Sequence, residues 1–355
     1  MTTILAAGDE FVRTDLLVRA LRERLDPATG PYDIRELSFD WPTTPWSDVA
    51  EVSEAAGGER AEETMIRALA GVRAAVTHLA PFTARVLENA PELELVVVSR
   101  GGPVNVNLDA ATAAGVVVCF APGRNAQAAA EFTIGLMLAA CRNIGNGHHE
   151  LMGGTWPGHY FRFDNAGSEL NGSTIGLVGY GAIGHLVGRI VTAFGAHVLV
   201  YDPYADPSGL DPAVERVDDL TDLLRRSRIV SLHARQTEET TGMIGAAELA
   251  AMPQGAVLVN SARGGLLDHI ALCDALDSGH LGAAALDVYP HEPLSLDGAD
   301  ARLRRTPNLV LTPHIAGCSR EVAIRAAGIC ADEVARWTRG EPPAHCANPG
   351  VLAPR

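Results

Sequence analysis

The sequence predicts an α/β protein with two domains, each built around a doubly wound parallel sheet. Three observations support this fold class. The chain has 355 residues, which suits two compact domains of about 150 residues each. Short runs rich in β-branched residues alternate with Ala-rich and Leu-rich helical stretches along almost the whole chain, as expected where helices join parallel strands. A glycine-rich segment, residues 179–184, directly follows one of the apolar runs.

The first third of the chain contains five predicted strands and two predicted helices between them, Phe11–Leu25 and Ala61–Ala70. The strands are expected at Thr3–Ala7, Asp33–Leu37, Ala74–Leu79, Leu93–Ser99 and Gly115–Phe120. A long apolar helix is expected over Ala126–Arg142, ending near Asn143.

A second series of strands begins after Ser173. They are expected at Thr174–Gly179, His197–Asp202, Arg228–Ala234, Ala256–Ala262, Ala284–Val288 and Leu309–Pro313. A further helix is predicted over Arg320–Arg339, followed by a Pro-rich tail, Glu341–Arg355.

The stretch His148–Leu170 shows no clear periodicity and is expected to be irregular. It gathers aromatic residues together with a histidine and a proline: Trp156, Pro157, His159, Tyr160, Phe161 and Phe163. Long loops usually carry function or contact other chains, and exposed aromatic residues favour a contact with a partner subunit. The alternative is a small cluster that covers the flank of its own domain.

The charge balance excludes one class of partner. The 28 Lys and Arg residues against 43 Asp and Glu residues give a formal net charge of −15, which disfavours binding to nucleic acid. Small anionic substrates remain possible, because one arginine or one helix N-terminus can hold an anion against an unfavourable overall field.

The cysteines and the hydropathy indicate a cytoplasmic protein. The six cysteines are scattered with no CxxC spacing, so we expect reduced, mostly buried thiols and no metal site. The N-terminus lacks the basic leader of a signal peptide, and no uncharged apolar stretch is long enough to span a bilayer.

The strongest local signal is the GxGxxG segment Gly179-Tyr180-Gly181-Ala182-Ile183-Gly184. Its first glycine permits a tight turn, the second lets the backbone approach a pyrophosphate, and the third lets helix and strand pack closely. The next strand ends at Asp202, where a carboxylate would bind the adenosine ribose and repel a 2′-phosphate. Pro203 and Tyr204 follow, with no arginine between. The sequence therefore predicts NAD in preference to NADP.

Three segments at the ends of later strands supply reactive side chains: Asn260–Gly265, Leu286–Pro293 and Thr312–Gly317. Interconversion of a 2-hydroxy acid and its 2-oxo acid needs a cation for the carboxylate and carbonyl, and an acid/base of near-neutral pKa. The planar guanidinium of Arg263 would bind the carboxylate and carbonyl oxygens of the substrate through two hydrogen bonds. His314 would transfer the proton. Glu292 would orient the His314 imidazole and adjust its basicity electrostatically.

With these motifs in this order and spacing, the chain from about Leu93 to Arg336 resembles the D-isomer-specific 2-hydroxyacid dehydrogenase family. The resemblance implies a Rossmann-like domain for NAD, residues 123–318, inserted into a flavodoxin-like substrate-binding domain, residues 1–122 and 319–355. It also implies a homodimer formed through an arm at residues 145–170. The chain ends where the family's catalytic core ends, so inhibition by serine through a regulatory domain is not expected.

The resemblance assigns roles to individual residues. Arg263, Glu292 and His314 would be catalytic, and Arg100, Gly101 and Gly102 would bind substrate together with Arg263 and His314. The residues expected to contact the cofactor are Gly179, Gly181, Ala182, Ile183, Gly184, Asp202, Pro203, His233, Ala234, Thr241, Ser261, Ala262, Asp287, His314 and Gly317.

Two departures from the family pattern leave specificity open. Pro103 and Val104 stand where many phosphoglycerate dehydrogenases have a glycine-containing segment, and Arg235 replaces a common proline. Arg235 is either a solvated side chain or a cofactor contact. The substrate is expected to be a phospho or phosphono acid such as 3-phosphoglycerate, or hydroxypyruvate or glyoxylate. Two alternatives stay open: a phosphite dehydrogenase-like oxidoreductase, and a non-catalytic NADH-sensing protein that resembles a corepressor.

Overall fold

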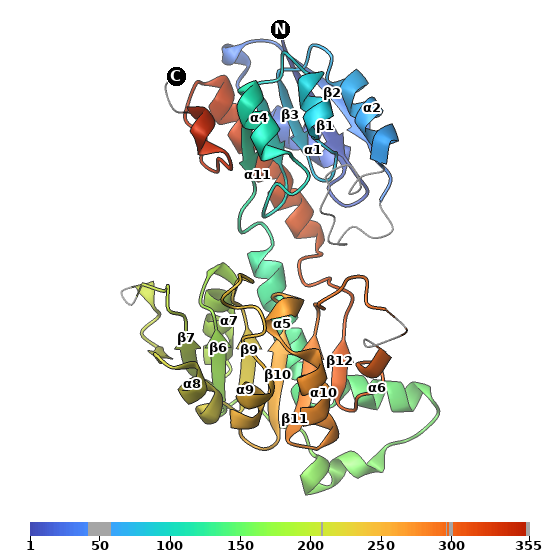
Figure 1. Cartoon of the computed structure of the whole chain (residues 1–355), viewed down its shortest axis with the longest axis vertical. Coiled ribbons are helices and arrows are strands. Elements are labelled where there is room, and N and C mark those ends of the chain that lie inside the picture. The colour runs from blue at the N-terminus through green and yellow to red at the C-terminus, as the bar shows by residue number, and fades with distance from the viewer. Residues whose placement is uncertain (42–57, 207–208, 296, 298–300, 353–355) are drawn as a thin grey trace. The chain divides into compact units, whose positions relative to one another are not determined.

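The computed structural model describes residues 1–41, 58–206, 209–295, 297 and 301–352. The chain forms two compact units, Met1–Asn125 with Ser319–Arg355, and Ala126–Cys318. Each unit contains one parallel sheet flanked by helices (Figure 1). The predicted fold class is confirmed, including the insertion of one α/β domain into the other.

The first unit has a five-stranded sheet of order β2-β1-β3-β4-β5, which is the flavodoxin-like arrangement. The strands are β1 (Thr2–Gly8), β2 (Tyr32–Ser38), β3 (Ala74–Thr77), β4 (Leu95–Val98) and β5 (Val117–Phe120). The helices are α1 (Thr14–Arg24), α2 (Gly58–Ala68), α3 (Ala84–Glu88), α4 (Leu108–Ala114) and α11 (Arg320–Thr338).

Alternate residues of these strands face two separate cores. Ile4 and Ala6 of β1 pack with helices α1 and α11, whereas Leu5 and Ala7 pack with α2, α3 and α4. Strands β1, β3, β4 and β5 are largely buried, which explains why they are almost continuously apolar in sequence, whereas the edge strand β2 is partly exposed and carries charged residues.

The second unit has a seven-stranded sheet of order β12-β11-β10-β9-β6-β7-β8, the dinucleotide-binding arrangement with one added strand. The strands are β6 (Thr174–Val178), β7 (His197–Tyr201), β8 (Val214–Arg216), β9 (Ile229–Leu232), β10 (Ala256–Asn260), β11 (Leu281–Leu286) and β12 (Leu309–Leu311). The helices are α5 (Ala126–Cys141), α6 (Ile144–Met152), α7 (Ala182–Ala193), α8 (Leu220–Arg226), α9 (Ala246–Ala251) and α10 (His269–Asp277).

All the strands expected from the sequence are present, and two elements differ from expectation. The stretch expected to be irregular from His148 is partly helical, because α6 runs from Ile144 to Met152. Strand β8 has no counterpart in the prediction. None of the helices described combines the length and the hydropathy that a bilayer crossing requires.

Candidate active site

The glycine-rich loop begins where β6 ends. Gly179 has φ +97°, and a Cβ built there would lie 2.6 Å from the backbone nitrogen of Ala234 and 2.7 Å from the carbonyl carbon of His233. A Cβ on Gly184 would lie 2.3 Å from the carbonyl oxygen of Gly179. Neither position has room for a side chain, so the loop, the strand end after β9 and helix α7 pack directly on one another.

Gly181, the second glycine of the segment, has free space around it, in contrast to Gly179 and Gly184. Gly181 is the N-cap of α7, and a Cβ built on it would meet no atom within 4 Å. The first turn of α7, which includes Ala182 and Ile183, therefore presents its backbone N–H groups beside open space. Such a helix start attracts phosphate groups through its unpaired donors and its dipole. The loop fits the pyrophosphate of a dinucleotide.

Asp202 follows β7 and lies beside this loop. Its Oδ2 accepts the N–H of Tyr180 at 2.8 Å, and its Oδ1 accepts the N–H of Tyr204 at 2.9 Å. A carboxylate can accept about four hydrogen bonds, so Asp202 keeps capacity for two ribose hydroxyls. Pro203 occupies the turn between Asp202 and Tyr204, and the side chain of Arg235 is exposed.

His233 and Ala234, at the end of β9, lie against Gly179. Burial lowers the pKa of His233 to about 4, so its imidazole is neutral at physiological pH and shares a hydrogen bond of 2.9 Å with Ser231 Oγ. Thr241 belongs to the following turn, where its hydroxyl donates to the carbonyl of Thr237. These groups place no charge beside the glycine-rich loop.

The segment after β10 orients Arg263. Asn260 Oδ1 accepts the N–H of Ala262 at 3.1 Å, and Asn260 Nδ2 donates to the carbonyl of Arg263 at 2.9 Å. Ser261 shares a hydrogen bond of 2.6 Å with Thr133 of α5. The Arg263 side chain itself is exposed, with Nη1 donating to the Ala262 carbonyl at 2.6 Å. Its remaining donors are available to an anion.

His314 and Glu292 form a direct pair. His314 Nδ1 lies 2.5 Å from Glu292 Oε2, and the two side chains are 30% and 14% exposed. The other carboxylate oxygen of Glu292 accepts the N–H of Tyr289 at 2.9 Å. Because the Glu292 carboxylate accepts a hydrogen bond from the N–H at Nδ1, the imidazole can exchange a proton at Nε2.

Asp287 holds the loop that carries His314. Its buried carboxylate accepts the hydroxyl of Thr312 at 2.6 Å and the N–H groups of Ile315 and Ala316 at 3.0 and 2.8 Å. His314 lies within this span with φ +54°, a conformation that non-glycine residues rarely adopt. Gly317 follows in the same turn. The family resemblance implied only that Asp287 would contact the cofactor, and its three contacts to this loop were not predicted.

Gly264 connects the Arg263 segment to the Glu292 segment. A Cβ built on it would lie 2.0 Å from both the carbonyl carbon and the carbonyl oxygen of Tyr289. The backbone beside Arg263 therefore packs directly on the backbone that leads to Glu292. In the sequence, Gly264 is recognisable only as part of the segment Asn260–Gly265, and its contact with Tyr289 was not predicted.

Three of the predicted substrate-binding residues, Arg100, Gly101 and Gly102, follow β4 in the first unit. Arg263, Glu292 and His314 belong to the second unit and lie at the carboxyl ends of its strands. Within the part of the chain that the structure describes, no group of three or more His, Cys, Asp or Glu residues is placed to hold a metal ion.

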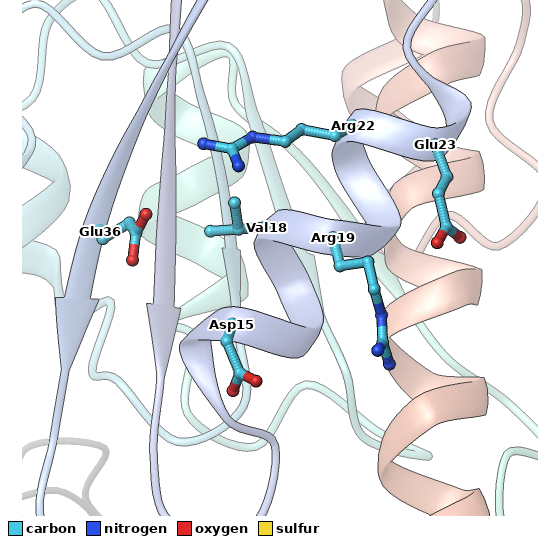
Figure 2. A pocket seen from close by; sticks show the side chains of 6 residues that line it. All are labelled: Asp15, Val18, Arg19, Arg22, Glu23 and Glu36. Carbon is cyan, nitrogen blue, oxygen red and sulfur yellow. The ribbon is translucent and has the colours of Figure 1, made fainter.

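A surface pocket of about 350 Å³ in the first unit is lined by residues of α1 and β2 (Figure 2). Its lining residues are Asp15, Val18, Arg19, Arg22, Glu23 and Glu36. Two arginines face three carboxylates, so the pocket has no consistent charge for a ligand, and none of the candidate site residues lines it.

The family described as "D-isomer specific 2-hydroxyacid dehydrogenase, NAD binding domain" matches residues 134–316. D-3-phosphoglycerate dehydrogenase of Mycobacterium leprae is 40% identical over 270 residues, which are 76% of this chain and 49% of that protein. Glyoxylate reductase of Aeropyrum pernix is 35% identical over 272 residues, covering 76% of this chain and 80% of that protein. The chain spans about half the length of the phosphoglycerate dehydrogenases it matches.

Solved structures show the same fold over nearly the whole chain. The TT0316 protein of Thermus thermophilus superposes with a TM-score of 0.76 at 28% identity, covering 98% of this chain and 100% of that one. D-2-hydroxyisocaproate dehydrogenase superposes with a TM-score of 0.80 at 24% identity, with the same two coverages.

Proposed function

The chain belongs to the D-isomer specific 2-hydroxyacid dehydrogenase family, and we propose that it is a cytoplasmic NAD(H)-dependent oxidoreductase that interconverts a small D-2-hydroxy acid and its 2-oxo acid. The contact that carries this proposal is the one between His314 Nδ1 and Glu292 Oε2 at 2.5 Å. This hydrogen bond would hold the imidazole in one tautomer, so that it can act as a general acid or base. The pair follows the carboxyl ends of strands in a dinucleotide-binding sheet, which is where such sheets bind ligands.

In the reducing direction, His314 carries a proton on Nε2 and donates it to the carbonyl oxygen of the substrate. Glu292 stabilises the imidazolium before the transfer, and holds the ring in place through its own bond to the Tyr289 N–H. Asp287 keeps the His314 loop in its left-handed conformation. In the oxidising direction the same Nε2 accepts the hydroxyl proton.

Arg263 would bind the substrate carboxylate and the carbonyl oxygen together. A guanidinium presents its donors in a rigid fork that matches two oxygen acceptors, and it meets the negative charge that develops on the oxygen in the transition state. The backbone after β4, at Arg100, Gly101 and Gly102, is proposed to bind the same carboxylate through its N–H groups.

The second unit fits NAD. We propose that the pyrophosphate binds in the open space at Gly181 and that Asp202 accepts hydrogen bonds from the ribose hydroxyls; the free space at Gly181 and the position of Asp202 beside the loop support this. When bound, NADH supplies the hydride that reduces the carbonyl carbon. The other proposed cofactor contacts are Gly179, Ala182, Ile183, Gly184, Pro203, His233, Ala234, Thr241, Ser261, Ala262, Asp287, His314 and Gly317.

The proposed substrates are a phospho or phosphono acid such as 3-phosphoglycerate, or hydroxypyruvate or glyoxylate. Purified protein should oxidise NADH with at least one of hydroxypyruvate, glyoxylate, pyruvate, 3-phosphohydroxypyruvate and phosphonopyruvate, measured by the loss of NADH absorbance. Absence of turnover with all five acids, in protein that binds NADH, would refute the proposal.

Replacing Asp202 with serine should shift the cofactor preference toward NADPH. The change removes the negative charge that repels a 2′-phosphate. It also removes one hydrogen-bond acceptor for the ribose hydroxyls. Each loss changes the free energy of cofactor binding by about 1–3 kcal/mol. The ratio of kcat/KM for NADH to that for NADPH should fall by about 10-fold or more. Asp218→Ser, at an exposed carboxylate of the same unit, serves as control. An unchanged ratio in Asp202→Ser would show that Asp202 does not discriminate between a ribose 2′-hydroxyl and a 2′-phosphate.

The arm that follows α5 is proposed to form the homodimer interface. Phe161 and Phe163 are 96% and 94% exposed, and Trp156 is 85% exposed. Within the arm, the Tyr160 hydroxyl donates a hydrogen bond of 3.1 Å to Glu150 of α6. Burial against a partner would remove a large apolar surface from water.

Replacing both Phe161 and Phe163 with serine should convert a dimer to a monomer in sedimentation experiments. Tyr204→Ser, at a tyrosine that is 83% exposed outside the arm, should leave the dimer intact. A wild-type monomer, or a double variant that remains dimeric, would contradict this assignment.

A further inference from the structure

Two cysteines of the first unit face each other across a short antiparallel bridge. Cys119 lies in β5, and Cys346 lies in the segment 344–348 that follows α11. Two backbone hydrogen bonds, of 3.2 and 2.7 Å, join the neighbours of the two cysteines rather than the cysteines themselves. They run from the N–H groups of Phe120 and Ala347 to the carbonyls of His345 and Val118, respectively. Nothing in the proposed mechanism uses either thiol.

This pairing brings the two side chains to the same face of the sheet at close range. Opposite residues whose neighbours carry the hydrogen bonds have Cα atoms about 4.5 Å apart, the closer of the two antiparallel arrangements. A disulfide spans Cα separations of about 4.4–6.8 Å. Both thiols are free in the structure, so Cys119 and Cys346 are reduced but already have the backbone spacing that a disulfide requires.

The side chain of Asn348 fixes the register of this pair. Asn348 is buried, its Oδ1 accepts the N–H of Val118 at 2.9 Å, and its Nδ2 donates to the carbonyl of Val116 at 2.9 Å. The Sγ of Cys346 lies 3.6 Å from the same Oδ1. A slip of one residue would break both bonds to β5 and its approach, and would leave a buried amide without partners. Cys346 therefore stays opposite Cys119.

A second anchor holds the same segment from the side of α11. The buried Glu333 of α11 accepts the N–H of Ala344 through Oε2 at 3.1 Å, and its Oε1 lies 2.8 Å from Nδ1 of His345. These contacts precede Cys346 in the chain and those of Asn348 follow it, so the backbone is held on both sides of the cysteine. Fixing both backbones in advance reduces the entropy that closing a disulfide would cost.

Exposure gives the two thiols different roles. Cys346 is half-buried, whereas Cys119 is 0% exposed. Burial raises the pKa of Cys346, and burial together with the nearby Glu333 and Cys346 raises the pKa of Cys119. The effect of Cys346 on Cys119 agrees with the backbone geometry. Because the thiolate is the reactive form of a cysteine, oxidation is slow and begins at Cys346, the thiol that solvent reaches.

We propose that Cys119 and Cys346 are a redox-active pair that forms an intramolecular disulfide when the protein meets a peroxide. The Cys346 thiolate attacks one peroxide oxygen, the O–O bond breaks, and a sulfenic acid and one water form. The sulfur of Cys119 then attacks the sulfenic sulfur, and a second water leaves as the S–S bond forms. The two thiols together lose two electrons and two protons, and hydrogen peroxide is reduced to two molecules of water.

The disulfide joins the two chain segments that make up the first unit. Cys119 belongs to Met1–Asn125 and Cys346 belongs to Ser319–Arg355, and the whole second unit lies between them in the sequence. A cross-link that closes so long a loop strongly restricts the unfolded chain. The oxidised protein should therefore unfold at a temperature about 4 °C or more above that of the reduced protein.

Peptide mapping of the wild-type protein after treatment with hydrogen peroxide tests the pair directly. Digestion without reductant should yield a peptide that links Cys119 to Cys346, and dithiothreitol should remove both this link and the gain in unfolding temperature. Cys318 is exposed, so its oxidation shows that the dose of peroxide was sufficient. A dose that oxidises Cys318 without forming the link, or a link from Cys119 to Cys330 in its place, would overturn the proposal.

Matched variants connect the link to the change in stability. Cys346→Ala and Cys119→Ala should each lose the gain in unfolding temperature on oxidation, whereas Cys330→Ala, at a buried cysteine of the same core, should retain it. Retention of the gain in Cys346→Ala would refute the pair. Protein unfolded in urea before oxidation should lose its preference for this link; an equal preference in folded and unfolded protein would show that the fold does not select it. These measurements need no NADH turnover, so their outcome is separate from that of the proposed function.

Discussion

Replacing His314 with alanine is expected to lower kcat by about 10²- to 10⁴-fold, the range that a positioned general acid/base contributes. The loss follows from the pairing of His314 Nδ1 with Glu292 Oε2 at 2.5 Å, which leaves Nε2 as the group that moves the proton. Affinity for NADH should stay within about 3-fold of wild type, because His314 is one of many proposed cofactor contacts and the glycine-rich loop and Asp202 are proposed to provide most of the binding to the dinucleotide. Steady-state turnover and a fluorescence titration with NADH measure the two quantities separately.

His197→Ala is a matched control for this variant. His197 is an exposed histidine of the same unit and begins β7, at the opposite end of that strand from Asp202. It should retain wild-type turnover. Glu292→Gln should reduce kcat less than His314→Ala, because the amide still orients the ring but no longer stabilises the imidazolium. A His314→Ala protein with turnover within about 3-fold of wild type would show that another group moves the proton.

Replacing Gly264 with alanine is expected to disrupt both the stability and the activity of the protein. The new Cβ would lie 2.0 Å from the carbonyl carbon and oxygen of Tyr289, and backbone atoms cannot move aside as a side chain can. Overpacking of this kind costs about 1–3 kcal/mol or more. The strain falls between the Arg263 segment and the segment leading to Glu292, so kcat should fall even in the fraction that remains folded.

The neighbouring glycine provides the control. The three atoms nearest to a Cβ on Gly265 all belong to the side-chain amide of Gln236, at 2.4–2.7 Å, and Gln236 is exposed. Because the Gln236 side chain can rotate into solvent, the free energy of unfolding of Gly265→Ala should lie within about 1 kcal/mol of the wild-type value. Urea denaturation measures the free energy of unfolding of both variants. Equal stability of the two alanine variants would show that the contact between Gly264 and Tyr289 does not constrain the site.

The order of elements was predictable because buried parallel strands leave a strong local signal. The runs at β6 and β10, for instance, are mostly apolar and almost completely buried, and each has a glycine on one side and a serine on the other. The prediction was wrong where that signal is weak. Helix α6 contains Gly145 and Gly147, which lower helix propensity, and strand β8 has three residues, none of them fully buried.

The candidate site was predictable only as far as its residues form local motifs. Arg263, Glu292 and His314 each follow a strand, and the edge of a parallel sheet gathers such residues. The three bonds of Asp287 to the His314 loop, and the contact of Gly264 with Tyr289, depend on how separate loops meet in space. The pairing of Cys119 with Cys346 joins residues on either side of the inserted unit, and no local pattern marks either one.

The central claim is that the protein transfers hydride between NAD(H) and a D-2-hydroxy acid, with His314 moving the proton. The most direct test is to let the protein consume a measured amount of NADH with the best 2-oxo acid that forms a chiral product, and to determine the configuration of that product by chiral chromatography. The account predicts one equivalent of the D-2-hydroxy acid for each NADH oxidised, and little product from His314→Ala. Formation of the L-isomer or a racemate, or oxidation of NADH without a hydroxy acid product, would contradict it.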